Sequence, residues 1–169
     1  MRTLTVIIGI ALAASSASCT AQTEPAAPAP SLPPRSTAAA QVHDRWVSCA
    51  GEPSVTYDDR TADDAITLPL LDAAFQPVAA VVCDRGADPS AAVEKQAQDV
   101  TALVAALRGP DQPLPTPDGD TVYGCTMAKI HVPWLALLDA GGRWVRPGLP
   151  RDYCGSVNGE VIEQIRALT

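Results

Sequence analysis

The chain has 169 residues, of which 47% are hydrophobic and 18% charged, and its 19 acidic and 12 basic residues give a formal net charge of −7. This excess of negative charge repels polyphosphates, so the composition argues against nucleic-acid binding and against adhesion to anionic membranes through a basic patch. The length predicts one domain plus a tail.

The N-terminus has the pattern of an export signal. Arg2 supplies a positive charge, and an apolar run from Leu4 to Ala14 precedes a stretch of small residues. The run is too short for a transmembrane helix, which needs ~20 residues. Residues 1–18 are therefore predicted to be a signal peptide.

Cys19 is predicted to carry a lipid anchor. The small residues before it resemble a bacterial lipobox, although Ser16 stands where leucine is usual. The chain has five cysteines, and assigning Cys19 to the anchor leaves an even set for disulfides in an oxidising compartment. We expect an extracytoplasmic protein held at the cell membrane by this lipid. The alternative is ordinary cleavage after Ala17 or Ala21 and secretion.

Residues 19–40 are predicted to be the lipidated cysteine and a disordered tether, and residues 41–169 a single globular domain. The tether is rich in Pro and Ala, with Glu24 and Arg35 as its charges, so it has too little apolar surface to offset the entropy cost of ordering. An extended Pro-rich segment would hold the domain away from its anchor. The alternative is a disordered leader with no spacing role.

Short apolar segments predict the first strands of the domain. Gln41–Ala50 enters the fold as an extended segment. The apolar run Val78–Cys83 is rich in β-branched residues and is typical of a buried strand, and Ile66–Leu71 is a second candidate strand.

A long helix is predicted over residues 89–108. Asp88 is a suitable N-cap and Pro89 suits the first helical position. Apolar residues then recur at helical spacing, and Gly109-Pro110 ends the pattern. The residues on this predicted apolar face are Val93, Ala97, Val100, Val104 and Leu107.

The C-terminal part predicts a hairpin and a second helix. Two apolar runs, 134–138 and 143–146, flank a Gly-bearing turn. Residues 122–127 are a further candidate strand, and Glu160–Leu168 has helical spacing. The fold class is therefore predicted to be α+β, an antiparallel sheet with one long helix and a C-terminal helix, stapled by disulfides.

Four cysteines remain for the domain: Cys49, Cys83, Cys125 and Cys154. Zinc sites need closely spaced pairs such as C-x-x-C, and these cysteines are far apart in the sequence. Two disulfides are therefore predicted, with three pairings open. We favour Cys125–Cys154, because these residues flank the hairpin, which leaves Cys49–Cys83.

No residue is predicted to be catalytic, and no cofactor is predicted. His131 lies beside apolar residues and Ser156 lies in a turn composition, and no G-x-S-x-G motif is present. A structural role is the favoured interpretation of both residues.

Two weaker binding patterns remain. Clustered carboxylates at Asp58, Asp59, Asp63 and Asp64 are weak calcium candidates, but they lack the ordered calcium-loop spacing, so a solvated face is favoured. Trp134 and Trp144 lie on the two hairpin strands and, with Trp46, are candidates for a sugar-stacking surface. A core role is favoured for these rings, because the chain has one Phe and few other large core residues.

The positions of cysteines and turns resemble those of uncharacterised secreted proteins and lipoproteins of actinobacteria. The resemblance rests on Val81-Val82-Cys83, Leu103–Arg108, Cys125, Asp139–Arg143, Cys154-Gly155 and Asn158-Gly159. It implies location and architecture, and it transfers no catalytic residue.

We expect a cell-envelope lipoprotein that acts as a non-enzymatic binding or accessory module. Its expected partners are the membrane, through Cys19, and a cell-wall component or an envelope protein. Alternatives are an envelope hydrolase that uses carboxylates or a metal in the Asp58–Asp64 region, and a structural or inhibitory interaction protein.

Overall fold

The computed structural model describes residues 33–55, 61–85, 92–113, 124–125 and 130–169. The chain divides into two units, Met1–Ser31 and Leu32–Thr169, and every described residue belongs to the second. The predicted signal peptide and Cys19 therefore lie outside the described residues. None of the helices in the described ranges is both long and apolar enough to cross a membrane.

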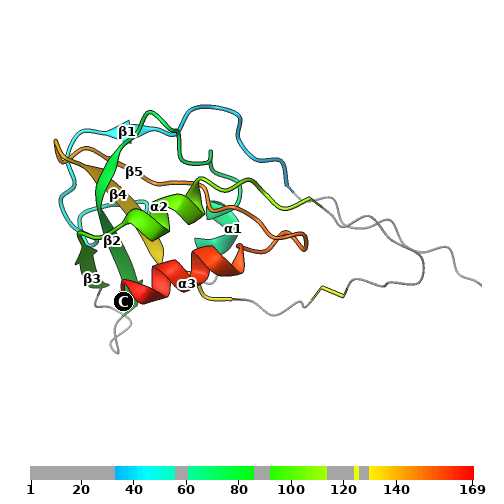
Figure 1. The fold of residues 1–169 in the computed structure, drawn as a ribbon. Helices are drawn as coiled ribbons and strands as arrows, with labels where there is room; N and C mark the ends of the chain where they lie inside the picture. The colour runs from blue at the N-terminus through cyan, green and yellow to red at the C-terminus, as the bar shows by residue number, and fades with distance from the viewer. Residues whose placement is uncertain (1–32, 56–60, 86–91, 114–123, 126–129) are drawn as a thin grey trace, which may run out of the picture. The chain divides into compact units, whose positions relative to one another are not determined.

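Five described strands form one antiparallel sheet in the order β1-β5-β4-β2-β3 (Figure 1). The strands are β1 (Val42–His43), β2 (Pro77–Arg85), β3 (Ala92–Ala97), β4 (Trp134–Asp139) and β5 (Trp144–Val145). The helices are α1 (Thr61–Ala65), α2 (Thr101–Leu107) and α3 (Gly159–Ala167). The predicted α+β class with an antiparallel sheet is confirmed.

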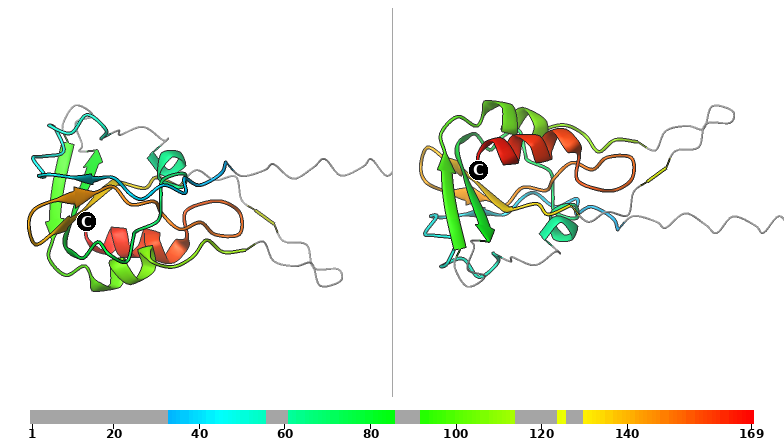
Figure 2. Two further views of the ribbon diagram at one scale, coloured as in Figure 1. Left: turned by 90° about the horizontal axis from the view of Figure 1, so that it is seen from above. Right: turned by 90° about the horizontal axis from the view of Figure 1, so that it is seen from below.

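The sheet is covered on both faces, which explains why β4 is apolar along its length. Successive side chains of a strand point to opposite faces. Leu135 and Leu137 therefore join one buried cluster with α2 and α3, whereas Trp134 and Ala136 join a second cluster on the other face. Figure 2 shows α2 and α3 side by side on one face of the sheet.

The predicted hairpin and C-terminal helix are confirmed. In the β4–β5 hairpin, Gly142 has a φ of 78°, a conformation that glycine adopts without strain. Helix α3 begins after Asn158, whose side chain accepts a hydrogen bond from the Glu160 N–H.

The long helix predicted at 89–108 is wrong. Residues 92–97 form strand β3, which pairs antiparallel with β2, and helix begins only at Thr101. Glu94 explains the difference in part. From the edge of the sheet its carboxylate accepts hydrogen bonds from the Cys49 N–H and from the Trp46 indole, and these long-range contacts outweigh local helix propensity.

The strand predicted at Ile66–Leu71 is reduced to a single bridge between Leu70 and Gly148. Pro69 has no N–H to donate to a ladder, although its carbonyl oxygen accepts from the Gly148 N–H at 2.7 Å. The strand predicted at 122–127 lies almost wholly outside the described residues.

The predicted start of the domain at Gln41 is too late. The segment Pro33–Gln41, which we call the strap, contacts the domain through Pro33, Arg35 and Ser36. The Ser36 N–H donates to the Thr67 carbonyl at 2.8 Å, and the Arg35 guanidinium reaches three other parts of the chain. The tether prediction therefore fails for residues 33–40, because a charged side chain in that segment finds partners on the domain.

Candidate functional site

Both favoured disulfides are present. Cys49 is bonded to Cys83, and Cys125 to Cys154. Both cysteines of the first bond are buried, and the bond joins the segment after β1 to strand β2, whereas Cys125 of the second bond is exposed. Two disulfides fit a chain that folds in an oxidising compartment outside the cytoplasm.

The three tryptophans form a packed group on the face of the sheet opposite α2 and α3. Trp134 and Trp144 are only 1% and 3% exposed, and the Trp46 ring lies 5.7 Å and 5.2 Å from theirs. Both hairpin rings are buried, and the Trp144 ring is stacked against His43. The structure gives them the core role that the sequence analysis favours.

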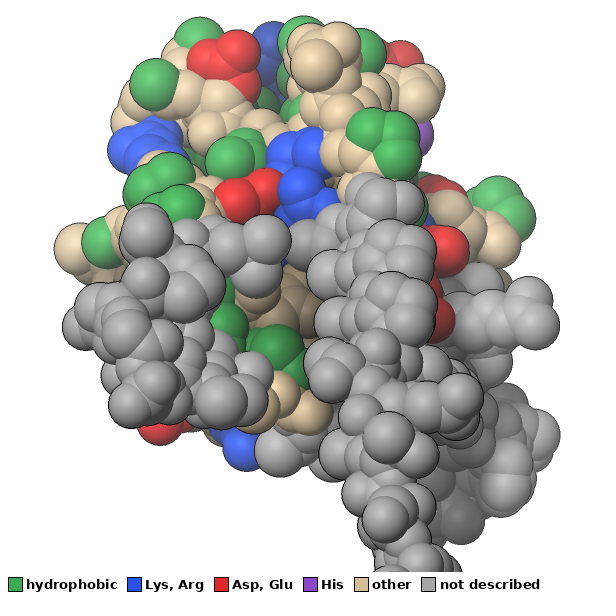
Figure 3. All heavy atoms as spheres, turned by 90° about the vertical axis from the view of Figure 1, so that its right-hand side faces the viewer, with side chains coloured by type: hydrophobic (Ala, Val, Ile, Leu, Met, Phe, Trp, Pro, Cys, Tyr) green, Lys and Arg blue, Asp and Glu red, His purple; other side chains and the backbone are tan. Residues whose placement is uncertain are grey.

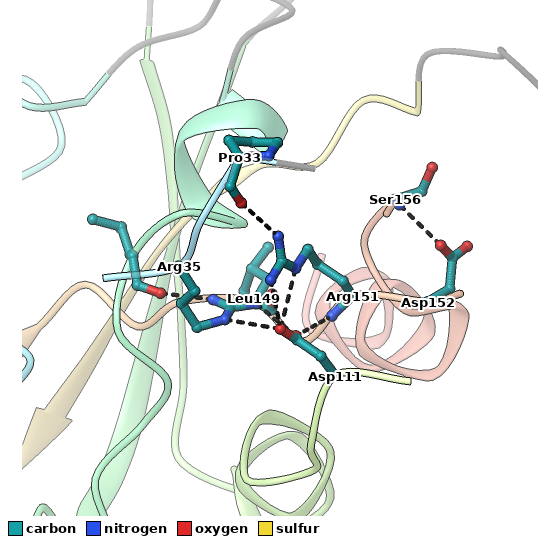
Figure 4. A network of polar contacts seen from close by, with 8 residues as sticks. Pro33, Arg35, Asp111, Leu149, Arg151, Asp152 and Ser156 are labelled. Carbon is teal, nitrogen blue, oxygen red and sulfur yellow. Dashed lines mark hydrogen bonds and ion pairs between the residues drawn. The ribbon is translucent and has the colours of Figure 1, made fainter. Parts of the chain in front are cut away.

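The other candidates from the sequence are not brought together into a site. His131 Nε2 lies 3.0 Å from the Asp84 carboxylate on an exposed part of the surface. Ser156 lies in a loop where its N–H donates to Asp152 Oδ1 (Figure 4). The structural interpretation of both residues stays a prediction.

The weak calcium candidates divide between described and undescribed residues. Asp63 and Asp64 are exposed on the short helix α1, and Asp58 and Asp59 lie outside the described residues. Within the described ranges, no group of three or more His, Cys, Asp or Glu side chains is arranged to hold a metal ion.

Arg35, Asp111 and Arg151 form a network that we call the clamp (Figure 4). The Asp111 carboxylate accepts five hydrogen bonds, two from the Arg35 side chain and three from the side chain and N–H of Arg151. Both arginine side chains are 12% exposed. The clamp thus fastens the strap to the loop after α2 and to the segment before α3.

The clamp also extends to backbone carbonyls. Arg35 donates to the carbonyls of Leu68 and Leu149, and Arg151 donates to that of Pro33 at 2.9 Å. Burial raises the pKa of Asp111, but the hydrogen bonds from the two arginines outweigh this effect and lower it to about 2. The carboxylate is therefore ionised at any physiological pH.

Charges of opposite sign are interspersed on the face of the molecule shown in Figure 3. Basic side chains there adjoin acidic ones and do not gather into a patch of one sign.

The strap forms one wall of a groove of about 350 Å³. The other walls are the segment with Glu52 and Ser54, the turn with Leu68 and Pro69, and the sheet, from which His43, Trp144 and Arg146 face the groove. The His43 ring stacks on Trp144 at 4.0 Å between centroids. The volume falls in the range of small-molecule sites, which is roughly 300–1,000 Å³.

Arg146 is the distinctive residue of this groove. It follows β5 two positions after Trp144, and its guanidinium lies over the Trp134 ring at 5.6 Å from the centroid. Its Nη2 atom is buried, and in the part of the chain that the structure describes this atom has no hydrogen-bond partner. Burial lowers the pKa of Arg146, and the negative charge of Asp64 opposes the shift.

A second unpartnered donor lies beside Arg146. The Trp134 indole N–H is buried and also has no partner within the described ranges. Both side chains line a second, smaller hollow, which shares Arg146 with the groove. A buried donor without an acceptor is costly, so this part of the protein is not optimised for stability alone.

Of the residues that line the groove, the sequence analysis named only Trp144 as a binding candidate. Arg146 carries a detectable signal, because strand alternation places it on the same side as the buried Trp144, where an apolar residue is expected. The sequence around Glu52 carries no such signal. The clamp carries none either, because Arg35 and Asp111 are 76 residues apart in the chain.

The resemblance to actinobacterial secreted proteins and lipoproteins rests on positions with clear structural roles here, such as Cys83 and Cys154 in the disulfides. Comparison with protein-family models, with curated proteins and with solved structures finds no match to the chain. The resemblance stays a prediction.

Proposed function

We propose that this protein is a cell-envelope lipoprotein, anchored through Cys19, whose domain is a non-enzymatic binding module for a small polar ligand. The observation that carries the binding function is the groove. It is of small-molecule size and contains a partly buried arginine, Arg146, whose buried Nη2 atom has no hydrogen-bond partner among the described residues.

The location is supported by independent features. The disulfides fit an oxidising compartment, and the export signal with small residues before Cys19 supports lipidation. Residues 20–32 would link the anchor to the strap. Release into the medium is the alternative location, and it does not change the proposed function of the groove.

Binding is supported by the cost of the Arg146 arrangement. Holding a guanidinium partly out of water without a hydrogen-bonded ion pair is unfavourable. The negative charge of Asp64 offsets only part of this cost, since the pKa of Arg146 is still lowered. The other two arginines described above, Arg35 and Arg151, share a carboxylate. A ligand that supplies an acceptor to Arg146 would remove this cost.

Native mass spectrometry of the protein from the membrane fraction of a native-type host tests the proposal. After incubation with a small-molecule extract of the cells, we expect a chain that begins at lipidated Cys19, has no free thiol before reduction, and carries an added small molecule that denaturation removes. In the groove-filling variant Ala38→Trp, at an exposed strap position, the added mass should disappear.

Two results would overturn parts of the proposal. An unlipidated chain found only in the medium would contradict the anchor. The absence of any added mass, or an added mass that Ala38→Trp retains, would contradict the groove as the binding site.

A further inference from the structure

The groove contains two opposite charges that do not pair with each other. Arg146 and Glu52 both line it, and the ion pairs among the described residues do not include one between them. We infer that the groove binds a small zwitterion, an amino acid or a short peptide with both ends free, with its carboxylate on Arg146 and its ammonium at Glu52. This inference rests on the proposed function of the groove.

A carboxylate is the anion that suits Arg146 best. The planar guanidinium donates two parallel hydrogen bonds to a carboxylate. A phosphate would bring more negative charge into a groove with a single arginine and a nearby glutamate, in a chain of net charge −7. Asp64 adds to the negative surroundings of Arg146, so a ligand group with one negative charge is favoured.

Glu52 is suited to an ammonium group. Its Oε1 atom accepts hydrogen bonds from the Ser54 N–H and hydroxyl at 3.0 Å and 2.6 Å, which fix the carboxylate at the wall of the groove. Among the described residues, no cation lies within ion-pair distance of this carboxylate. An ammonium donates three hydrogen bonds, so it can use the remaining acceptor positions.

The rest of the groove suits a compact polar molecule. The stacked ring of His43 gives one flat wall. The strap adds the polar side chains of Ser36 and Gln41, and its alanines leave space beside the two charges. The ends of an amino acid or dipeptide thus meet opposite charges, and its small side chains meet neutral walls.

Isothermal titration with L-alanyl-L-alanine tests the inference on the full mature protein. Two derivatives each remove one charge, N-acetyl-alanyl-alanine and alanyl-alanine amide. We expect the free dipeptide to bind at least about tenfold more tightly than either derivative, since each loses a charge-assisted hydrogen-bonded contact.

Two groove variants assign the ends. Glu52→Gln keeps the acceptor for Ser54 and should weaken the free dipeptide about tenfold while leaving the acetylated one unchanged. Arg146→Met should weaken binding of the free dipeptide about tenfold and leave binding of alanyl-alanine amide unchanged. Arg166→Met and Glu163→Gln, at exposed positions of α3, are the matched controls and should have no effect.

The outcomes separate this inference from the proposed function. Equal binding of all three dipeptides, lost in Ala38→Trp, would overturn the zwitterion and leave the binding groove standing. No binding of any dipeptide by a protein that retains a cellular ligand in native mass spectrometry would also overturn the zwitterion alone. No dipeptide binding together with no retained ligand would overturn both.

Discussion

Replacing Cys49 and Cys83 together with alanine is expected to lower the free energy of unfolding by about 3–5 kcal/mol. Closing a loop of this size accounts for about 3–4 kcal/mol in the chain-entropy model, and the two half-cystines are also buried, at 3% and 1% exposure. The bond ties the segment after β1 to the C-terminal part of β2. Its loss releases this segment, whose Trp46 packs on Trp134 and Trp144. Urea denaturation followed by tryptophan fluorescence measures the change.

The second disulfide provides the control. Cys125–Cys154 closes a loop of similar length, with separations of 29 and 34 residues for the two bonds, but Cys125 is exposed. In the Cys125→Ala, Cys154→Ala variant, the free energy of unfolding should therefore fall by the loop-closure contribution alone, with little further loss from packing. Equal losses for the two double variants would contradict a packing role for the buried bond.

Asp111→Ala is expected to lower the free energy of unfolding by about 2 kcal/mol. Removing one member of a buried ion pair costs about 3–5 kcal/mol, and the smaller value allows for the 28% exposure of the Asp111 side chain. The variant leaves two arginines facing each other without a counter-charge. Amide hydrogen exchange should also accelerate at Ser36, whose N–H bonds to Thr67.

The clamp also predicts a direction of pH dependence. The pKa of Asp111 falls from 3.8 to about 2 on folding, so its contribution is fully present above pH ~4 and is lost as the pH falls toward 2. Between pH ~4 and 2, the free energy of unfolding should therefore fall less in Asp111→Asn than in the native chain. Asp44→Ala, at an exposed carboxylate, is the control. An Asp111→Ala variant as stable as this control would mean that the clamp is only a surface contact.

The local sequence was sufficient to predict the elements that are bounded by a favourable turn or helix-cap residue. The hairpin has Gly142 in its turn, and α3 has Asn158 as its cap. The apolar run of β2 was also correctly predicted as a buried strand, because its composition is local to the segment. Because both faces of the sheet are covered, the consecutive residues Val81 and Val82, which point to opposite faces, are both buried.

The region 92–107 could not be predicted from local pattern. Its residues include strong helix formers, and the helical spacing through Val93 and Ala97 occurred by chance in what is an edge strand. What makes it a strand is pairing with β2 and the bonds from Glu94 to residues far earlier in the chain. Such contacts leave no periodic signal in the sequence.

The groove was hidden from the sequence for the same reason. Its walls come from the strap, the segment around Glu52 and strand β5, which are distant in the chain. The strap itself was assigned to a disordered tether on composition, and one arginine and a carboxylate 76 residues away reverse that assignment. Composition predicts the average behaviour of a segment and not the partner of one side chain.

The two kinds of arginine in this domain illustrate different uses of charge. Arg35 and Arg151 have a shared carboxylate and several carbonyl oxygens as partners, and they hold chain segments together. The guanidinium of Arg146 lies over a tryptophan ring, and its Nη2 atom has no hydrogen-bond partner in the described part of the chain. In the proposed function, Arg146 lowers the stability of the free protein and increases its affinity for a ligand.

The free energy of unfolding of Arg146→Met, measured in urea without ligand, tests this central claim most directly. If the guanidinium is kept for a ligand, the uncharged side chain should leave the protein as stable as the native chain or about 1 kcal/mol more stable, because an unpaired, partly buried charge is removed. A loss of more than about 1 kcal/mol relative to Arg166→Met would contradict the claim, because the contact with Trp134 would then make Arg146 a structural residue.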